Sequence, residues 1–406
     1  MEKSYSLHTL ANGLRIAYSR RQGNVAYCGL AVNAGSRDES PEHHGLAHFV
    51  EHTIFKGTKK RRAWHILNRM ERVGGELNAY TTKEETLVYS VFPSGNMERA
   101  VELISDLVTN SVFPEKELMK EKEVVIEEIQ SYRDTPSEAI FDDFEDIIFK
   151  GNELGHNILG TEECLERIGS AECMNHLKRL YVPENMVLFA VGSIPEEKML
   201  RLAERYFAHI DHRLPLRHRT TPVIATPFNT EKLIDSHQAH TIVGAPTFGM
   251  HDANKYALLL LNNIIGGPGM NSTLNVAIRE RRGYAYTVES SVTLFSDCGL
   301  LTIYFGSDEK HVDKCLQLIH RELDRFASKQ LSQTALDAAK KQFIGQLLVG
   351  SENPENYALS LGKSILNFGN FNSVNEIADR IRAVTPDQIR LAAEAIVPRC
   401  STLRFH

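Results

Sequence analysis

Hydrophobic and polar positions in the first quarter of the chain alternate in a way that predicts short strands separated by helices. An Asn-Gly pair at positions 12–13 separates two strand-like runs, which is a strong signal for a β-hairpin. Residues 25–36 predict a buried strand that ends at a turn. A helical period follows around residues 45–56, and a second helix over 63–75 stops at two glycines. The segment 77–93 is rich in β-branched and aromatic residues and predicts another hairpin.

The pattern continues with two helices near 96–110 and 115–132, a strand over 184–194 and a helix over 195–210. Residues 212–230 differ, because three prolines among mixed polar residues favour an extended linker over a helix.

After the linker, the order of predicted elements repeats. A strand over 240–249 and a helix over 254–267 precede further strands and an amphipathic helix within 283–323. The tripeptide Ala-Tyr-Thr occurs at positions 79–81 and again at 285–287, each time before strands and then a helix. We interpret the chain as two copies of one α+β unit, with halves at 1–211 and 231–406.

Composition and charge limit the possible partners and the compartment. The chain has 406 residues, 42% hydrophobic and 24% charged, as expected of a soluble globular protein. Its net charge of −6, without a block of like charge, argues against nucleic acid or a membrane as partner. Six scattered cysteines form no C-x-x-C pair, and no segment resembles a signal peptide or a membrane span. We therefore expect a cytoplasmic protein.

The stretch GLAHFVEHTIFKGT places three titratable residues inside an apolar helical period. His48 and His52 are four residues apart and share one face of the helix, so both imidazoles could bind one ion. Zinc favours nitrogen ligands and, in catalytic sites, leaves one position open for water. Glu51 could take a proton from that water as the water attacks a carbonyl. His44 lies one turn upstream, but Gly45 is expected to mark the helix start and to leave His44 in the preceding loop.

A catalytic zinc site usually needs a third protein ligand, and the helix MKEKEVVIEEIQSY is dense in glutamate. Such runs are usually solvated, but the apolar residues within this one indicate partial burial. Glu121, Val125 and Glu128 form one stripe, which is unfavourable for two carboxylates unless a cation meets them. Spacing alone does not choose between Glu127 and Glu128 as the ligand.

The pattern H-x-x-E-H resembles the inverted zincin motif of the pitrilysin and insulinase metallopeptidases. The similarity is greatest to the processing-peptidase branch, which includes the mitochondrial processing peptidase β subunit and its bacterial relatives. The blocks GGELNAYTTKEETLVY, VVIEEI, ILGT, YVPENMVLFAVG and IRERRGYAYTV resemble family blocks in the right order and span nearly the whole chain.

This resemblance implies a zinc-dependent endopeptidase that holds one zinc ion per chain. It implies that His48, His52 and Glu128 are the zinc ligands and that Glu51 is the general base. It also implies that Glu121 lies behind the ligands and orients one of them.

The resemblance further implies that each half is an α+β sandwich with a mostly antiparallel sheet, and that the halves and their symmetry mate enclose a chamber. A substrate peptide would add as a strand at the segment around Asn78 and Ala79. The glycine-rich GGPGMNS lacks the ending of a phosphate-binding loop and resembles a flexible loop of the family, from which Pro268 departs.

In the second half, Arg279 and Tyr286 match an Arg-Tyr pair of the family. The resemblance implies that Tyr286 donates to the developing oxyanion and that Arg279 holds the substrate backbone. Two alternatives are an inactive structural or assembly subunit and a chain that needs a different partner for catalysis. Because this chain carries both the zinc motif and the Arg-Tyr pair, we expect an active homodimer or self-sufficient chain that cleaves peptides.

Overall fold

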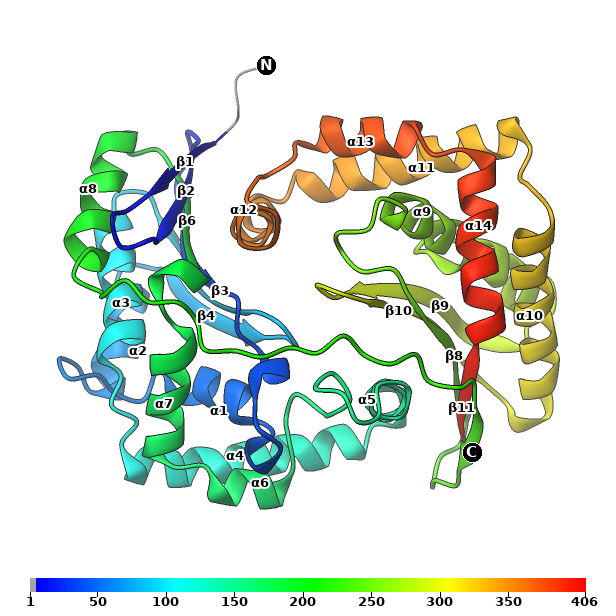
Figure 1. Cartoon of the computed structure of the whole chain (residues 1–406), viewed down its shortest axis with the longest axis horizontal. Coiled ribbons are helices and arrows are strands. Elements are labelled where there is room, and N and C mark those ends of the chain that lie inside the picture. Colours follow the sequence, from blue (N-terminus) through cyan, green and yellow to red (C-terminus); the bar gives the residue numbers. More distant parts are fainter. Residues whose placement is uncertain (1–4) are drawn as a thin grey trace. The chain divides into compact units, whose positions relative to one another are not determined.

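Two β-sheets, each in its own compact unit, organise the computed structural model, which describes residues 5–406 (Figure 1). Unit 1 comprises 5–129, 156–219 and 351–373, and unit 2 comprises 130–155, 220–350 and 374–406. No helix in this described part is long and apolar enough to cross a membrane.

The sheet of unit 1 has six strands in the order β1-β2-β6-β3-β5-β4. Along the chain these are β1 (Ser6–Thr9), β2 (Arg15–Arg20), β3 (Val25–Val32), β4 (Glu76–Thr81), β5 (Thr86–Pro93) and β6 (Met186–Gly192). All neighbours are antiparallel except β2 and β6. The predicted hairpin at 12–13 joins β1 to β2, and Gly13 there has a φ of +93°, which glycine adopts without strain.

Helices cover both faces of this sheet. The main core lies on one face, where buried side chains of α1, α3, α7 and α8 meet those of the strands. The α-helices of unit 1 are α1 (Leu46–Thr53), α2 (Ala63–Glu71), α3 (Met97–Asn110), α4 (Glu115–Arg133, mostly in this unit), α6 (Glu162–Arg167), α7 (Ser170–Leu180), α8 (Glu196–Phe207) and α12 (Pro354–Phe368). Short 3-10 turns are η1 (Ser36–Asp38), η2 (Pro41–His43) and η3 (Pro183–Asn185).

The sheet of unit 2 has five strands in the order β7-β11-β8-β10-β9. They are β7 (Asn229–Lys232), β8 (Ala239–Thr247), β9 (Ala285–Leu294), β10 (Gly299–Ser307) and β11 (Ser401–Phe405). Its α-helices are α5 (Pro136–Ile148), α9 (Lys255–Gly266), α10 (Val312–Ser328), α11 (Gln333–Ser351), α13 (Val374–Arg382) and α14 (Pro386–Ile396), with the π-helix η4 (Asn275–Glu280) and the 3-10 turns η5 (Glu309–His311) and η6 (Val397–Arg399). The predicted linker has no regular structure until β7 begins.

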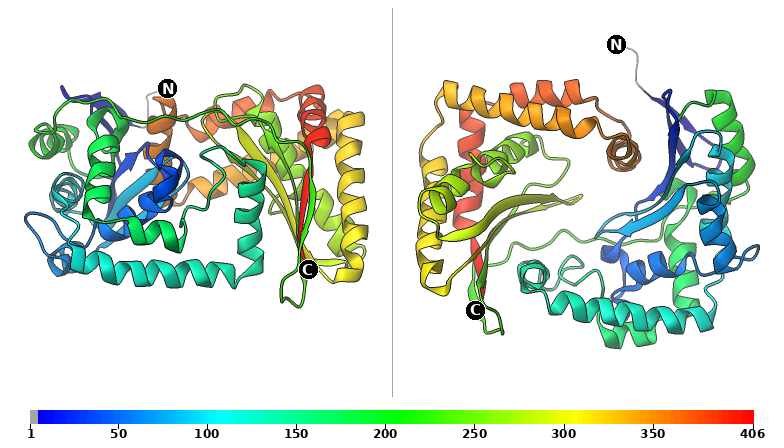
Figure 2. Two further views of the ribbon diagram at one scale, coloured as in Figure 1. Left: turned by 60° about the horizontal axis from the view of Figure 1, so that its bottom comes forward. Right: turned by 180° about the vertical axis from the view of Figure 1, so that it is seen from behind.

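Each unit contains one helix-bearing segment from the other half of the sequence. The predicted halves at 1–211 and 231–406 did not include this exchange. The late helix α12 packs on β6 and β3 of unit 1, on the face opposite the main core (Figures 1 and 2). The early helix α5 packs on β8 and β11 of unit 2. Each sheet is therefore covered on one face by a helix from the other half of the sequence. This face is apolar, and the helices of the sheet's own half leave it uncovered.

Candidate metal centre

Helix α1 begins where the sequence predicts, at a glycine that no other residue could replace easily. Gly45 is the N-cap and has a φ of +95°, and a Cβ there would lie 2.5 Å from the carbonyl oxygen of Leu159. His44 therefore precedes the helix, and its ring stacks on that of His156 with centroids 3.8 Å apart. The alternative of His44 as a third histidine ligand is not supported.

Because glycine has no side chain to cap the helix, the side chain of Glu39, six residues earlier, caps it. The Oε2 atom of Glu39 accepts a hydrogen bond from the amide of Gly45 (2.9 Å), and Oε1 accepts one from the amide of Ala47 (2.7 Å). His156 Nε2 lies 3.0 Å from Glu39 Oε2. Burial raises the pKa of Glu39 to about 8, although both amides oppose this shift. This network, which we did not predict from the sequence, fixes the first turn of the helix that bears the histidines.

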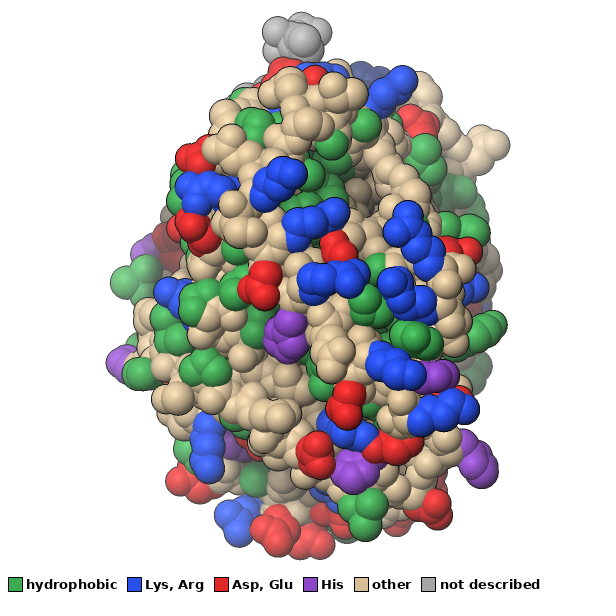
Figure 3. Space-filling model, turned by 90° about the vertical axis from the view of Figure 1, so that its right-hand side faces the viewer, with side chains coloured by type: hydrophobic (Ala, Val, Ile, Leu, Met, Phe, Trp, Pro, Cys, Tyr) green, Lys and Arg blue, Asp and Glu red, His purple; other side chains and the backbone are tan. Residues whose placement is uncertain are grey.

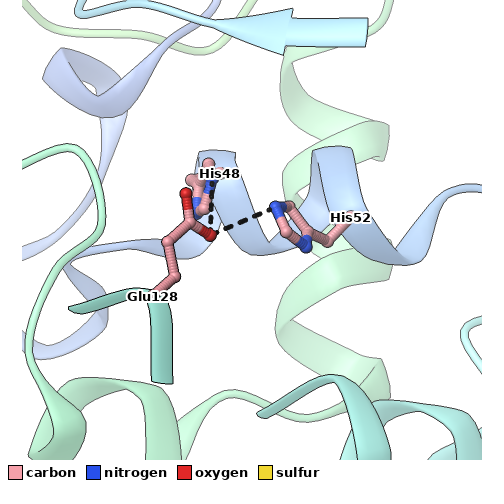
Figure 4. A group of neighbouring side chains, drawn as sticks. All are labelled: His48, His52 and Glu128. Carbon is pink, nitrogen blue, oxygen red and sulfur yellow. Dashed lines mark ion pairs between the residues drawn. The ribbon is translucent and has the colours of Figure 1, made fainter. Parts of the chain in front are cut away.

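Three potential ligand atoms converge between α1 and α4 (Figure 4). Nε2 of His48 and Nε2 of His52 lie 3.8 Å and 3.6 Å from Oε2 of Glu128. All three atoms lie within 4.8 Å of one another. Two ligands that share a tetrahedral zinc ion are about 3.3–3.6 Å apart, so small side-chain movements would place all three on one ion. The donor set of two imidazoles and one carboxylate is one that zinc binds in catalytic sites.

The structure distinguishes the two candidate glutamates on α4. Glu128 is half-buried and reaches the histidines, whereas Glu127 is exposed. Val125 is fully buried between Glu121 and Glu128 on the predicted stripe. Successive residues of a helix are rotated by about 100° around its axis. This rotation turns the carboxylate of Glu128 toward the histidines and that of Glu127 toward solvent.

Burial and charge prepare the two histidines for a cation. Burial, together with neighbouring His52, lowers the pKa of His48 to about 3, so this ring is neutral at pH 7 and keeps a lone pair for a metal. Burial also disfavours the charged form of His52, but a hydrogen bond with Glu121 and the charges of Glu128 and Glu51 outweigh it and raise the pKa of His52. A negative environment that attracts a proton also attracts a divalent ion.

Glu121 lies directly behind His52, as the resemblance implied. Its Oε1 atom is 3.0 Å from Nδ1 of His52, and Oε2 is 2.6 Å from Nζ of Lys56. Although burial opposes ionisation, these two partners lower the pKa of Glu121, so the carboxylate is charged at pH 7. A charged acceptor at Nδ1 holds the proton there and leaves Nε2 free to bind a metal.

Glu51 lies on α1 beside the metal-binding group but is not part of it. Burial raises its pKa, while hydrogen bonding to Thr81 and the charge of His52 oppose the shift. Thr81 is the last residue of β4, which forms an edge of the six-stranded sheet. Asn78 and Ala79 lie on the same strand, opposite Tyr89 and Val88 of β5, and no strand in the described part pairs with the other side of β4.

The remaining predicted residues, Arg279 and Tyr286, lie in unit 2. Arg279 is near the end of η4, and Tyr286 is on the edge strand β9 with 78% of its surface exposed. The guanidinium carbon of Arg279 lies 5.7 Å from the centre of the Tyr286 ring. Both residues line a cavity of about 490 Å³ together with the glycine-rich loop that contains Pro268. The predicted pair is thus assembled within its own unit.

Comparison with known protein families gives two matches that together cover most of the chain. A model described as insulinase (peptidase family M16) matches residues 15–162, which include the whole predicted zinc site. A model described as the peptidase M16 inactive domain matches residues 171–343, which include Arg279 and Tyr286.

Relatives of similar length carry names that agree with the metal-binding geometry. The chain is 32% identical over 403 residues to an uncharacterized zinc protease of Streptomyces coelicolor, covering 97% of this chain and 88% of the relative. It is 31% identical to the uncharacterized zinc protease YmxG of Bacillus subtilis, covering 94% and 93%.

Among solved structures, the fold is similar to that of a protease from Helicobacter pylori, with a TM-score of 0.91, 18% identity and 99% of both chains covered. It is also similar to a peptidase M16 inactive domain from Pseudomonas fluorescens, with a TM-score of 0.92, 18% identity and coverage of 99% and 98%.

Proposed function

Because this chain belongs to the insulinase family of peptidases, M16, we propose that it is a zinc-dependent endopeptidase that hydrolyses peptides or unfolded segments. The observation that carries the proposal is the position of the metal-binding group beside an unpaired strand edge. His48, His52 and Glu128 form the group, and the neighbouring Glu51 contacts the end of β4 through Thr81. A peptide that pairs with β4 would therefore pass close to both a metal and a base.

Each side chain has a distinct role in this mechanism. A zinc ion held by the two histidines and Glu128 would polarise the scissile carbonyl and acidify water. Glu51 takes a proton from the attacking water and later delivers it to the leaving amine, and its raised pKa favours this transfer. Glu121 orients His52 through its contact with Nδ1.

The free edge of β4 supports a substrate class of extended peptide. A strand that adds to this edge is held by backbone hydrogen bonds, which depend little on side-chain identity. We propose that Asn78 and Ala79 contribute to this pairing, so that unfolded segments of many sequences are accepted.

The test is Glu51→Gln in the full-length chain loaded with zinc. The amide keeps the size of the side chain but cannot accept the proton, so turnover of a fluorogenic peptide should fall by roughly a hundredfold or more. Zinc content, measured by atomic emission, should stay close to that of the wild type. Exposed Glu127→Gln is the matched control and should keep its activity. Near-normal turnover of Glu51→Gln would rule out Glu51 as the base.

A second candidate is a chain that is inactive alone or depends on a partner, and the match of residues 171–343 to an inactive domain favours it. Against it, this chain carries both the zinc motif and the Arg-Tyr pair. We propose that Tyr286 stabilises the oxyanion and that the purified chain, as a homodimer or alone, cleaves peptides. Tyr286→Phe should then lower the turnover number while zinc stays bound. An inert wild-type chain with full zinc would favour the partner-dependent alternative.

A further inference from the structure

A second site for a charged ligand lies on the surface of unit 1, in residues with no part in the proposed hydrolysis. A cavity of about 260 Å³ is formed by the segment leading into α2, by α2 itself and by α3. Its lining includes five cationic side chains and no carboxylate. These are Lys60, Arg61, Arg69, Arg72 and Arg99, and Trp64 lies among them.

Two carboxylates of α3 hold part of this lining in place from behind. Arg61 forms ion pairs with Glu102 and Asp106, and Asp106 lies 2.6 Å from Nη1 of Arg61. Arg69 is 3.1 Å from the other oxygen of Glu102. The charges of these two arginines are therefore balanced, and their guanidinium groups form a fixed wall of the cavity.

The charges of the remaining cations are not balanced. Arg99 donates through Nη1 to the backbone carbonyl of Arg69 at 2.9 Å, and Arg72 stacks over the Trp64 indole at 4.8 Å. Neither arginine has a carboxylate partner among residues 5–406. The third cation, Lys60, is 65% exposed in its side chain and reaches Asp106 only at 4.0 Å. Five cations against two carboxylates leave a local charge of about +3, in a chain whose net charge is −6.

The basic side chains on α10 and α14 of unit 2 provide a contrast. Figure 3 shows the face that these helices form, where acidic side chains are interspersed among the basic ones. Arg390 pairs there with both Asp387 and Glu394, at 2.8 Å and 2.6 Å, and Arg321 and Arg325 share Glu322. These three arginines therefore have carboxylate partners, unlike Arg72 and Arg99.

We propose that the cavity beside Trp64 binds a phosphate-bearing anion. A guanidinium group without a carboxylate partner presents paired N–H donors that match two phosphate oxygens. A multiply charged anion is needed to balance the three excess positive charges. Trp64 is 56% exposed, so its indole offers a face on which a nucleobase could stack. Both an inorganic polyphosphate and a nucleoside phosphate carry the required group, and they differ in whether they use the indole.

Tryptophan fluorescence monitors this site directly, because Trp64 is the only tryptophan of the chain. Fluorescence of the full-length protein is followed during titration with orthophosphate, pyrophosphate, tripolyphosphate, ATP and AMP at constant ionic strength. A saturable change with tripolyphosphate and ATP is expected. Tighter binding of ATP than of tripolyphosphate assigns a nucleoside phosphate, and equal binding assigns the polyphosphate. If each phosphate compound changed the fluorescence only as much as potassium chloride does, the proposal would be overturned.

Substitutions separate specific binding from general charge attraction. Arg99→Gln and Arg72→Gln should each weaken binding by roughly tenfold or more, because a charged donor to phosphate is lost. Arg390→Gln removes the same charge elsewhere and should leave the affinity unchanged. Unchanged affinity in both cavity variants, or tighter binding of a tetraglutamate peptide than of pyrophosphate, would refute the assignment. Zinc content and peptide cleavage without added anion should not differ between these variants, so the result is independent of the proposed peptidase activity.

Discussion

Removing the Glu39 carboxyl group should destabilise the start of α1 and thereby the candidate metal site. In Glu39→Ala, the amides of Gly45 and Ala47 lose their acceptor, and His156 loses its contact with Glu39. The Glu39 side chain is 0% exposed, so water does not readily replace it. Each buried donor left without an acceptor costs about 1–3 kcal/mol. Two amides therefore predict a loss of about 2–6 kcal/mol, a large share of the roughly 5–15 kcal/mol that stabilises a typical domain.

Urea unfolding followed by circular dichroism measures this loss, with zinc affinity as a second measurement. The midpoint should move to lower urea concentration, and zinc should bind more weakly, since His48 follows Ala47 directly. Glu42→Ala on the same loop is the control, because that side chain is exposed and should leave both quantities unchanged. An unfolding midpoint and zinc affinity equal to those of the wild type in Glu39→Ala would refute the capping role.

Two further predictions concern charge. Glu128→Gln should lower zinc occupancy far more than Glu127→Gln, because only Glu128 faces the histidines and a neutral amide is a poor ligand. Equal occupancy by atomic emission would contradict this ligand assignment. Burial lowers the pKa of His176 to about 4, so the unfolded chain binds a proton below pH 6.5 that the folded chain binds only near pH 4. Stability should therefore fall as the pH drops through this interval, by about 3 kcal/mol, and urea unfolding of His176→Phe should lack this part of the slope. An identical slope in the variant would exclude His176 as the cause.

The sequence predicted most of the elements, and it predicted that His48 and His52 lie together, because both depend on local spacing. Periodicity located the hairpins and the main helices, since alternating and helical patterns each mark one buried face. His48 and His52 were found because a four-residue spacing places two side chains on one helical face. The choice of Glu128 over Glu127 required the family resemblance, because both lie in one glutamate-rich helix whose orientation depends on tertiary packing.

What the sequence did not reveal depends on side-chain contacts that no local motif or periodicity marks. Glu39 caps α1 from a loop six residues before Gly45, and no local motif marks it, because the N-cap glycine has no side chain. The excess positive charge at Arg72 and Arg99 likewise depends on how α2 packs on α3, because Glu102 and Asp106 of α3 pair with Arg61 and Arg69 instead. The exchange of α5 and α12 was missed because amphipathicity shows which face of a helix is buried but not which sheet covers it.

The exchange itself makes a testable prediction about Phe144 of α5. Its ring is fully buried and lies so close to Gly244 of β8 that a Cβ there would be 2.6 Å from the ring. Phe144→Ala should cost about 3–5 kcal/mol, since it removes an aromatic ring from a packed core. Hydrogen exchange should then accelerate in β8 and β11 of unit 2. Glu138→Ala on the same helix is exposed and serves as control.

If each half of the sequence packed only on its own sheet, α5 would cover the six-stranded sheet, and the Phe144→Ala change would weaken strands such as β3 and β6 instead. The two outcomes affect different peptides in the same experiment, so the packing of α5 is decided without reference to any activity. Faster exchange confined to β3 and β6 would refute the exchange of segments. Faster exchange in β8 and β11 alone would show that a helix encoded in the half that contains His48 and His52 stabilises the sheet that carries Tyr286.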